Sequence, residues 1–332
     1  MNVAVVGSGA WGTALALQLH KNGHNTWLWT RDEEKARKMR QSCCNARLEG
    51  VCLPKDLKIT GDAENLQDCT LVVIATPSVY FRETCQVIAP YLHRDAVVVS
   101  VTKGIESGTL KRMSQIAREE THHPVVVLTG PNHAEEVARG IPTGSLAACE
   151  QRELAELVQS VFMSDAFRIY TSPDVVGAEL GGAMKNVIAL CAGVCDGLGF
   201  GDNTKSMLMT RGLTEIARLG VAMGANRDTF AGLAGMGDLI TTCTSMHSRN
   251  RRAGILIGQG KTPEEAMDEV GAVVEGYYAA KSSYEIAQKY KVEMPIMSAA
   301  YKALYENVSA KEAVHDLLLR QSRPEQEDSR WL

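Results

Sequence analysis

A single ammonium group interrupts an apolar helical pattern at residues 181–194, GGAMKNVIALCAGV. Glu179 and Lys185 are the only charged residues between 175 and 195, which predicts that Lys185 lies against a domain interface. A buried ammonium must be paired, face a wet cleft or have a lowered pKa. In a cleft it can donate or accept a proton near neutral pH. The alternative is a lysine that extends to the surface along a helix of small residues.

A second group of residues predicts an anion site. In the segment 232–252, GLAGMGDLITTCTSMHSRNRR, Asp238 follows a run of glycines and Ser248 is a plausible helix N-cap. Arg249 and Asn250 would then lie in the first helical turn, where the backbone already attracts anions. This pattern favours a phosphate clamp. The alternative is a basic surface turn.

Further polar residues stand at the ends of predicted strands, where ligands of open α/β sheets bind. Lys103 follows one strand in VTKG, and Gly130 and Asn132 follow another in TGPNHA. Lys103 could instead be a solvated loop charge. Glu275, in VVEGYYAA, could be an ordinary first-turn helix carboxylate or an acceptor for a cofactor ribose hydroxyl.

A glycine motif opens the chain. VAVVGSGAWGTALALQL places Gly7, Gly9 and Gly12 in a GxGxxG spacing after a strand and before a helix, which is typical of a dinucleotide-binding loop. The alternative is a simple tight turn. Trp11, inside the motif, could shield a cofactor or pack against the core.

The end of the second predicted strand bears on cofactor choice. An acid there binds the ribose hydroxyls of NAD, and an arginine accommodates the extra phosphate of NADP. The chain has Arg31 followed by Asp32, so NADP is favoured and NAD remains possible. Either charge could also belong to the solvated turn.

Two kinds of structure must position these residues, a sheet in the first half of the chain and helices in the second. Apolar, mostly β-branched runs predict strands in the first half, separated by helical patterns or turn-rich links: NVAVVG, NTWLWT, LVVIATP, AVVVSVTKG, PVVVLTGP, GSLAACE and FRIYTS. This alternation predicts an α/β fold, a Rossmann-type doubly wound, mostly parallel sheet.

From about residue 174 the strands stop and successive helices follow, with start signals at Thr262-Pro263 and at Ser309 with Glu312. We expect residues 1–172 to form a dinucleotide-binding domain and 173–332 an all-helical substrate domain. The final segment RQSRPEQEDSRWL lacks periodicity, and we expect it to be frayed.

Composition excludes several classes of function. Lys and Arg number 35 against 39 Asp and Glu, with a pI near 6.1, so a nucleic-acid-binding or membrane-surface protein is not indicated. No apolar run reaches the roughly 18 residues of a membrane span, and the N-terminus lacks a secretory pattern. Nine cysteines without a CxxC pair predict no metal site and no disulfide framework, which favours a reducing cytoplasm.

Six motifs, taken in order, resemble those of the bacterial-type NAD(P)-dependent glycerol-3-phosphate dehydrogenases. They are GSGAWGTALA, VTKGIE, TGPNHAEEVARG, GGAMKNVIAL, GMGDLITTCTSMHSRNRR and VVEGY. The resemblance covers about residues 2 to 320. It implies a C-terminal domain like that of 6-phosphogluconate dehydrogenases, and interconversion of sn-glycerol 3-phosphate and dihydroxyacetone phosphate for phospholipid biosynthesis. It also implies a homodimer.

The resemblance further assigns roles. Lys185 becomes the proton donor or acceptor. The implied substrate contacts are Lys103, Gly130, Asn132, Lys185, Asn186, Asp238, Thr242, Ser248, Arg249 and Asn250. The implied NADP or NAD contacts are Gly7, Gly9, Ala10, Trp11, Gly12, Arg31, Lys103, Ala134, Arg249, Val273 and Glu275. Ala10 and Asn132 depart from the family pattern, because both replace residues that carry hydroxyl groups.

Two other functions compete with this one. A related hydroxyacid dehydrogenase would share the sheet, the helical domain and the lysine, but its carboxylate substrate would not need the phosphate clamp. A noncatalytic dinucleotide-binding sensor would keep the glycine loop, but it would have no use for Lys185, Asp238 and Arg249 together.

Overall fold

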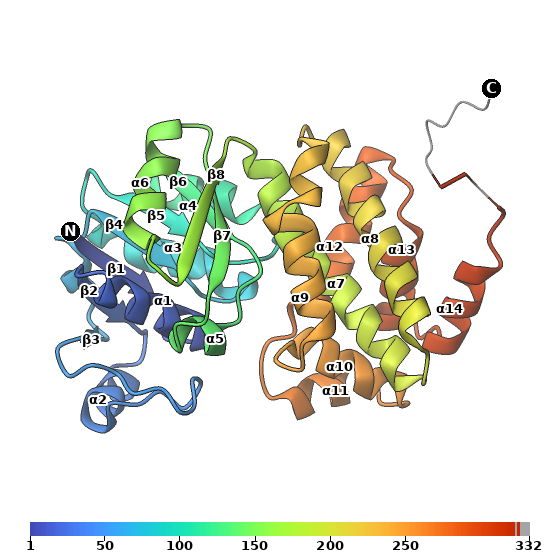
Figure 1. Cartoon of the computed structure of the whole chain (residues 1–332), viewed down its shortest axis with the longest axis horizontal. Coiled ribbons are helices and arrows are strands. Elements are labelled where there is room, and N and C mark those ends of the chain that lie inside the picture. Colours follow the sequence, from blue (N-terminus) through green and yellow to red (C-terminus); the bar gives the residue numbers. More distant parts are fainter. Residues whose placement is uncertain (323, 326–332) are drawn as a thin grey trace.

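The fold consists of an α/β half and an all-helical half that lie side by side (Figure 1). The structure is a computed structural model that describes residues 1–322, 324 and 325. The first half contains an eight-stranded sheet in the order β3-β2-β1-β4-β5-β6-β7-β8. The doubly wound sheet followed by helices confirms the predicted fold class.

The strands are mainly those that the β-branched runs predict. Their bounds are β1 Asn2–Val6, β2 Asn25–Trp29, β3 Lys58–Thr60, β4 Leu71–Ile74, β5 Val97–Ser100, β6 Val125–Thr129, β7 Thr143–Ala148 and β8 Phe167–Ser172. Neighbouring strands pair in parallel except β6 and β7, which pair antiparallel with Leu128 opposite Ala147. The sequence did not predict β3, because a three-residue strand is too short to show a periodic pattern.

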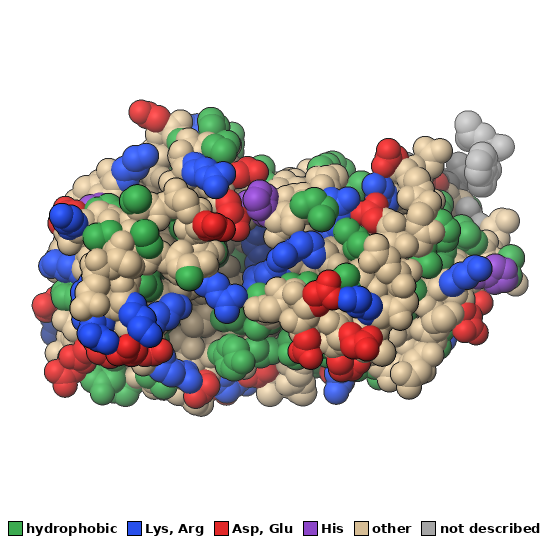
Figure 2. All heavy atoms as spheres, turned by 90° about the horizontal axis from the view of Figure 1, so that it is seen from below, with side chains coloured by type: hydrophobic (Ala, Val, Ile, Leu, Met, Phe, Trp, Pro, Cys, Tyr) green, Lys and Arg blue, Asp and Glu red, His purple; other side chains and the backbone are tan. Residues whose placement is uncertain are grey.

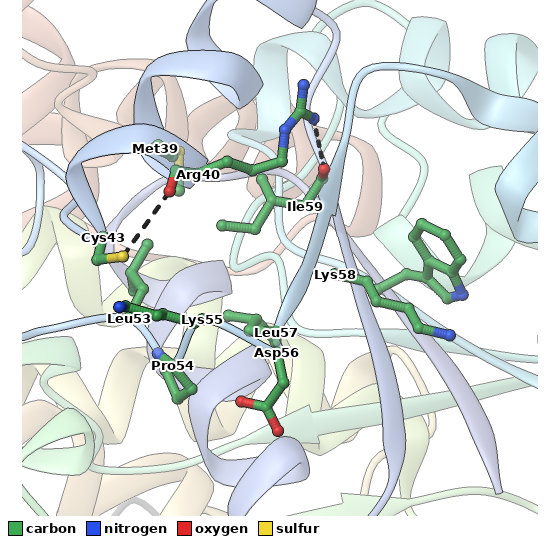
Figure 3. Close-up of a pocket in the computed structure, with 11 residues that line it drawn as sticks. Met39, Arg40, Cys43, Leu53, Pro54, Lys55, Asp56, Leu57, Lys58 and Ile59 are labelled. Carbon is green, nitrogen blue, oxygen red and sulfur yellow. Dashed lines mark hydrogen bonds between the residues drawn. The ribbon is translucent and has the colours of Figure 1, made fainter.

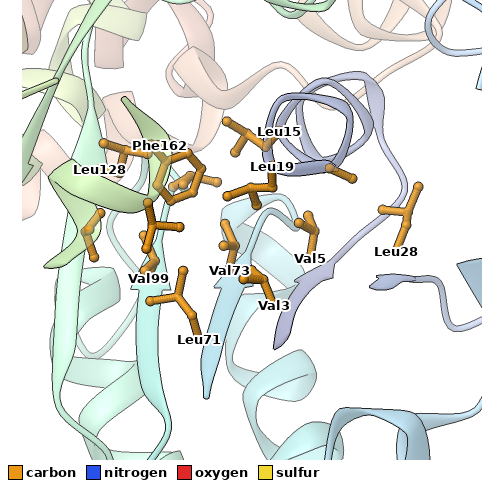
Figure 4. Close-up of a cluster of buried hydrophobic side chains, with 14 of the residues drawn as sticks. Val3, Val5, Leu15, Leu19, Leu28, Leu71, Val73, Val99, Leu128 and Phe162 are labelled. Carbon is orange, nitrogen blue, oxygen red and sulfur yellow. The ribbon is translucent and has the colours of Figure 1, made fainter. Parts of the chain in front are cut away.

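Helices cover both faces of the sheet. They are α1 Ala10–Lys21, α2 Glu33–Ser42, α3 Phe81–Ile88, α4 Met113–Thr121, α5 Ala134–Ala138 and α6 Arg152–Phe162, with short 3₁₀ turns η1 Ala63–Leu66, η2 Ser78–Tyr80 and η3 Ala89–Tyr91. On one face, side chains of β1, β4 and β5 pack against Leu15 and Leu19 of α1 and Phe162 of α6 (Figure 4). Burial of each such side chain contributes about 1.5–3 kcal/mol, which fixes the glycine loop between β1 and α1.

The second half is helical throughout its described residues. Its helices are α7 Val175–Gly197, α8 Asp202–Ala222, α9 Asp238–Thr244, α10 Arg249–Gly258, α11 Pro263–Val270, α12 Glu275–Tyr290, α13 Pro295–Tyr305 and α14 Ala310–Leu318, with turns η4 Arg227–Ala231 and η5 Leu233–Gly237. Both predicted start signals are confirmed. Thr262 caps α11, with Pro263 as its first residue, and the Ser309 hydroxyl accepts a hydrogen bond from the Glu312 N–H.

Helix α7 is the centre of this half. Among the described helices, α7 is the one with the length and apolar composition of a membrane span. However, 89% of its most apolar stretch is buried inside the protein. Glycines let α10 cross it closely. A Cβ added to Gly193 would lie 2.0 Å from the Arg251 carbonyl oxygen, and one added to Gly254 would lie 2.0 Å from the Leu190 carbonyl oxygen. This contact brings the start of α10 beside the middle of α7.

The chain passes between the halves over a short connection. Strand β8 ends at Ser172, and the Asp174 side chain caps α7 by accepting a hydrogen bond from the Gly177 N–H. The division into domains 1–172 and 173–332 stays a prediction. Most of the segment expected to be frayed, residues 323 and 326–332, lies outside the described residues.

Candidate functional site

A buried carboxylate joins two ammonium groups where the halves meet. The Nζ of Lys185 lies 2.7 Å from Oδ1 of Asp238, and the Nζ of Lys103 lies 2.6 Å from Oδ2 of the same side chain. Lys103 also donates to the Gly130 carbonyl oxygen at 2.9 Å. Lys103 and Gly130 follow β5 and β6, whereas Lys185 and Asp238 belong to α7 and α9. The cluster therefore exists only when both halves are in place.

Lys185 does not reach the surface along its helix. Its side chain is 6% exposed, and burial lowers its pKa to about 8 even though the Asp238 carboxylate opposes this shift. The Thr242 hydroxyl contacts the ammonium and donates to the Asp238 carbonyl oxygen at 2.7 Å. A lysine with these surroundings has both protonation states accessible near neutral pH.

The start of α10 lies beside this cluster. Ser248 is its N-cap and accepts from the Arg251 N–H at 3.2 Å. The Asn250 amide donates to Oδ1 of Asn186 at 2.9 Å and accepts from the Gly276 N–H at 2.8 Å, which fixes the ends of α10 and α12 against α7. The Arg249 side chain is exposed at this helix start. A helix N-terminus with an adjacent exposed guanidinium can bind a phosphate.

The glycine loop has the geometry of an anion cradle. Gly7 has a φ of +112°, and a Cβ added to Gly12 would lie 1.9 Å from the Gly7 carbonyl oxygen. Gly9 is the N-cap of α1, and no side chain caps that helix. The first N–H groups of α1 are therefore available to a pyrophosphate. Trp11 is half-buried and packs against the adjoining apolar clusters.

Two cations follow β2, and one of them contacts this loop. Arg31 donates to Glu83 Oε1 at 3.0 Å, and Asp32 caps α2 by accepting from the Lys35 N–H at 3.2 Å. The Lys35 ammonium donates to the Ser8 carbonyl oxygen at 3.1 Å. Burial and the nearby Arg47 guanidinium lower the pKa of Lys35. Sequence reasoning missed Lys35, although its place one turn after the cap could have identified it.

Two predicted contacts make bonds between elements. Glu275, the first residue of α12, accepts hydrogen bonds from the Ser78 N–H at 3.0 Å and from the Ser78 hydroxyl, and burial raises its pKa. The Asn132 side chain donates to the Gly144 carbonyl oxygen at 3.1 Å and accepts from the Ser145 hydroxyl at 2.7 Å. Both polar atoms of the Asn132 amide are therefore bonded to β7. Of the remaining predicted contacts, Ala134 is buried at the start of α5 and Val273 lies just before α12.

Figure 2 shows a hollow between the two halves in which Lys and Arg side chains gather. Cations between a half that carries a dinucleotide-type glycine loop and a half that carries a buried lysine suit an anionic substrate that is reduced or oxidised by a nicotinamide cofactor.

Comparisons with known proteins agree with this geometry. Residues 2–155 match the model of the NAD-dependent glycerol-3-phosphate dehydrogenase N-terminus, and residues 174–315 match that of the C-terminus. The chain belongs to the NAD-dependent glycerol-3-phosphate dehydrogenase family. A curated relative from Fusobacterium nucleatum, glycerol-3-phosphate dehydrogenase [NAD(P)+], is 48% identical over 330 residues, covering 98% of each chain.

A second curated relative of the same description, from Desulfitobacterium hafniense, is 50% identical over 98% of this chain and 93% of its own. A crystal structure of glycerol-3-phosphate dehydrogenase from Coxiella burnetii is 34% identical and has a TM-score of 0.92, covering 96% of this chain and 99% of that one. As a member of this family the protein is an NAD(P)-dependent oxidoreductase, which confirms the resemblance inferred from the six motifs.

Proposed function

We propose that the protein interconverts dihydroxyacetone phosphate and sn-glycerol 3-phosphate, mainly towards glycerol 3-phosphate for phospholipid biosynthesis, with Lys185 as proton donor and acceptor. The observation that carries this proposal is the buried Lys185 ammonium, paired with Asp238 where the two halves meet. When bound, the nicotinamide cofactor supplies or accepts the hydride.

The substrate phosphate would be held at the start of α10. Arg249 supplies a guanidinium, and the first N–H groups of the helix supply donors. Asn250 and Asn186 fix this helix end against α7 through their mutual hydrogen bond. The phosphate then sets the distance from the substrate carbonyl to the middle of α7. Gly130, Asn132, Thr242 and Ser248 complete the surroundings in this proposal.

Lys185 would act on the carbonyl oxygen. In the reducing direction its ammonium stabilises the developing alkoxide and transfers a proton to it, and in the oxidising direction the neutral amine takes that proton back. Asp238 keeps the Nζ of Lys185 in position, and Lys103 neutralises the second oxygen of that carboxylate. A partly desolvated ammonium is suited to this role because it releases its proton more readily than a solvent-exposed lysine.

We further propose NADP as the preferred cofactor, held by the loop Gly7, Gly9, Ala10, Trp11 and Gly12 and by Ala134, Val273 and Glu275. Arg31, just after β2, and Lys35, in the first turns of α2, provide two cations near the place where the extra phosphate of NADP would bind. Asp32 is engaged as a helix cap. A cytoplasmic location and a homodimeric assembly belong to the same proposal.

The decisive experiment incubates the purified chain with NADPH and dihydroxyacetone phosphate and follows the loss of NADPH absorbance. We expect turnover with this ketone and none with 2-oxo acids. Turnover with 2-oxo acids instead would point to a hydroxyacid dehydrogenase. NADPH binding without turnover of either substrate would indicate a sensor.

The role of Lys185 is tested by Lys185→Ala. We expect turnover to fall by about 10²–10⁴-fold, the usual contribution of general acid–base catalysis, with NADPH affinity nearly unchanged. Lys205→Ala is the matched control, because Lys205 also pairs with aspartates, Asp196 at 2.9 Å and Asp202 at 3.0 Å, outside the site. Full turnover in Lys185→Ala would remove this residue from the mechanism.

A further inference from the structure

The loop after α2 brings two cysteines opposite each other. Cys44 and Cys52 form an isolated antiparallel β-bridge, and the Leu53 N–H donates to the Cys43 carbonyl oxygen at 2.8 Å. This bond flanks the bridge, so Cys44 and Cys52 occupy a non-hydrogen-bonded pair, in which Cα atoms stand about 4.5 Å apart. Disulfides need Cα separations of about 4.4–6.8 Å. Both cysteines are exposed free thiols.

The adjacent Cys43 is placed differently. It is in the left-handed region with a φ of +49°, and its Sγ lies 3.7 Å from the Arg40 carbonyl oxygen. Figure 3 shows this sulfur among the side chains that line a surface pocket between α2 and the segment Leu53–Ile59. The pocket volume is about 300 Å³. Cys43 is therefore a matched control for its neighbour.

The residues between the two thiols connect three parts of the molecule. The Asn45 amide donates to the Ser8 carbonyl oxygen in the glycine loop at 3.1 Å and to the Thr13 hydroxyl at 2.6 Å. Leu48 is buried against Ala14, Ala134 and Val137. Arg47 donates to the Gly271 carbonyl oxygen in the helical half at 3.3 Å. A constraint on this loop acts directly on the glycine loop.

We propose that Cys44 and Cys52 are a redox-active dithiol whose disulfide locks the loop 44–52 against the glycine motif. A low-molecular-weight disulfide such as oxidised glutathione is the oxidant. The thiolate of one cysteine attacks that disulfide, forms a mixed disulfide and releases one glutathione thiol. The second thiolate then attacks the sulfur of the first cysteine, which forms the Cys44–Cys52 disulfide and releases the second glutathione thiol. Two electrons and two protons pass from the cysteine pair to two glutathione thiols.

The disulfide closes a short ring that contains Asn45 and Arg47. Ordering this ring before the cofactor arrives reduces the conformational entropy lost on binding. We therefore expect the oxidised protein to bind NADPH several-fold more tightly and to release NADP⁺ more slowly. In a reducing cytoplasm such a disulfide is transient, as in redox-sensing proteins. The thiol chemistry is independent of the proposed reaction, whereas the cofactor readout rests on it.

The test treats the full chain with graded ratios of oxidised to reduced glutathione and measures intact mass, peptide mass and NADPH binding by fluorescence. In wild type and Cys43→Ser we expect a loss of two hydrogens, a Cys44–Cys52 peptide cross-link and tighter NADPH binding that dithiothreitol reverses. In Cys44→Ser and Cys52→Ser we expect a stable glutathione adduct on the remaining cysteine and unchanged NADPH binding.

Three results would overturn the proposal. They are persistent glutathione adducts in wild type, a cross-link that Cys43→Ser abolishes, and a Cys44–Cys52 cross-link that leaves NADPH binding unchanged. Failure of the reduced wild type to bind NADPH would instead count against the proposed function. All three variants change surface or half-buried thiols to hydroxyls of similar size, and thermal unfolding of each reduced variant confirms that it folds.

Discussion

Lys185 shows how one residue can be found from sequence while its partners cannot. It is one of two charges between residues 175 and 195, which predicted its burial. Its pairing with Asp238, which also binds Lys103, depends on α9 and the loop after β5 meeting at α7, which no local pattern records. The contacts of Lys35 and Asn45 with the Ser8 carbonyl oxygen were likewise unpredicted, because they form only when α2 and its following loop fold back over α1.

The pKa of Lys185 sets a pH dependence. Burial lowers this pKa from 10.5 to about 8, so ketone reduction, which needs the ammonium, should fall above pH 8 by about tenfold per pH unit. Alcohol oxidation, which needs the amine, should rise over the same interval. In Asp238→Asn the carboxylate that raises this pKa is lost, and both limbs should move to lower pH. Initial rates measured from about pH 6 to about pH 10 test this pH dependence. A limb that stays in place in Asp238→Asn would contradict the assignment.

Lys35 should determine cofactor preference. If its ammonium contacts the extra phosphate of NADPH, Lys35→Met removes a charge-assisted bond of about 1.5–3 kcal/mol, on the order of a tenfold or greater loss of NADPH affinity. NADH affinity should change little. Lys38→Met is the control, because Lys38 lies on the same helix and pairs with Glu34 at 3.4 Å. Equal losses for NADPH and NADH, measured by fluorescence titration, would show that Lys35 supports only the loop.

At the scale of elements, local patterns predicted seven strands and the helical second half, because apolar residues mark the buried positions of each element. They could not predict that β7 runs antiparallel to β6, because strand direction is set by the connection through α5 rather than by side-chain alternation. Nor could they predict the crossing of α7 and α10, which depends on glycines from segments about sixty residues apart, such as Gly193 and Gly254.

This crossing predicts a large effect of one methyl group. In Gly254→Ala the new Cβ would lie 2.0 Å from the Leu190 carbonyl oxygen, so the helices must separate. We expect a loss of about 1–3 kcal/mol or more in the free energy of unfolding, and weaker substrate binding because the start of α10 moves. Urea unfolding measures the first effect. In Gly201→Ala, where an added Cβ meets open space and φ is −84°, the loss should stay below about 1 kcal/mol. A Gly254→Ala protein as stable as Gly201→Ala would show that the helices can separate at no cost.

At the scale of the whole molecule, a second buried carboxylate joins the two halves. Glu179 of α7 accepts from the Ser114 N–H at 2.7 Å and from the Ser114 hydroxyl at 2.6 Å, and it pairs with Arg112 at the start of α4. Sequence marked Glu179 only as a charge in an apolar helix, and its partners came from the other half.

Breaking this link should destabilise the molecule. Glu179→Gln leaves the Arg112 guanidinium and the α4 terminus without a carboxylate, for an expected loss of about 3–5 kcal/mol in the free energy of unfolding. Glu156→Gln is the control, since its pair with Arg152 on α6 is solvent-exposed and should be worth less than about 1 kcal/mol. Urea unfolding compares the two. Equal small losses would show that water or rearrangement replaces the Glu179 bonds.

The contacts between the halves differ from one side of the hollow to the other. The contacts are apolar where β6 and β7 face α7 and η5. There, Val127 and Ala148 pack against Val175, Ala178 and Ala234. On the glycine-loop side, polar bonds join Ser78 to Glu275 and Arg47 to Gly271, beside the buried Ile105. Water can replace the exposed bond of Arg47 at small net cost, whereas separating the apolar patch is unfavourable. We therefore expect the two halves to rotate relative to each other about Val127 and Val175, so that the apolar patch stays in contact while the hollow opens to release product.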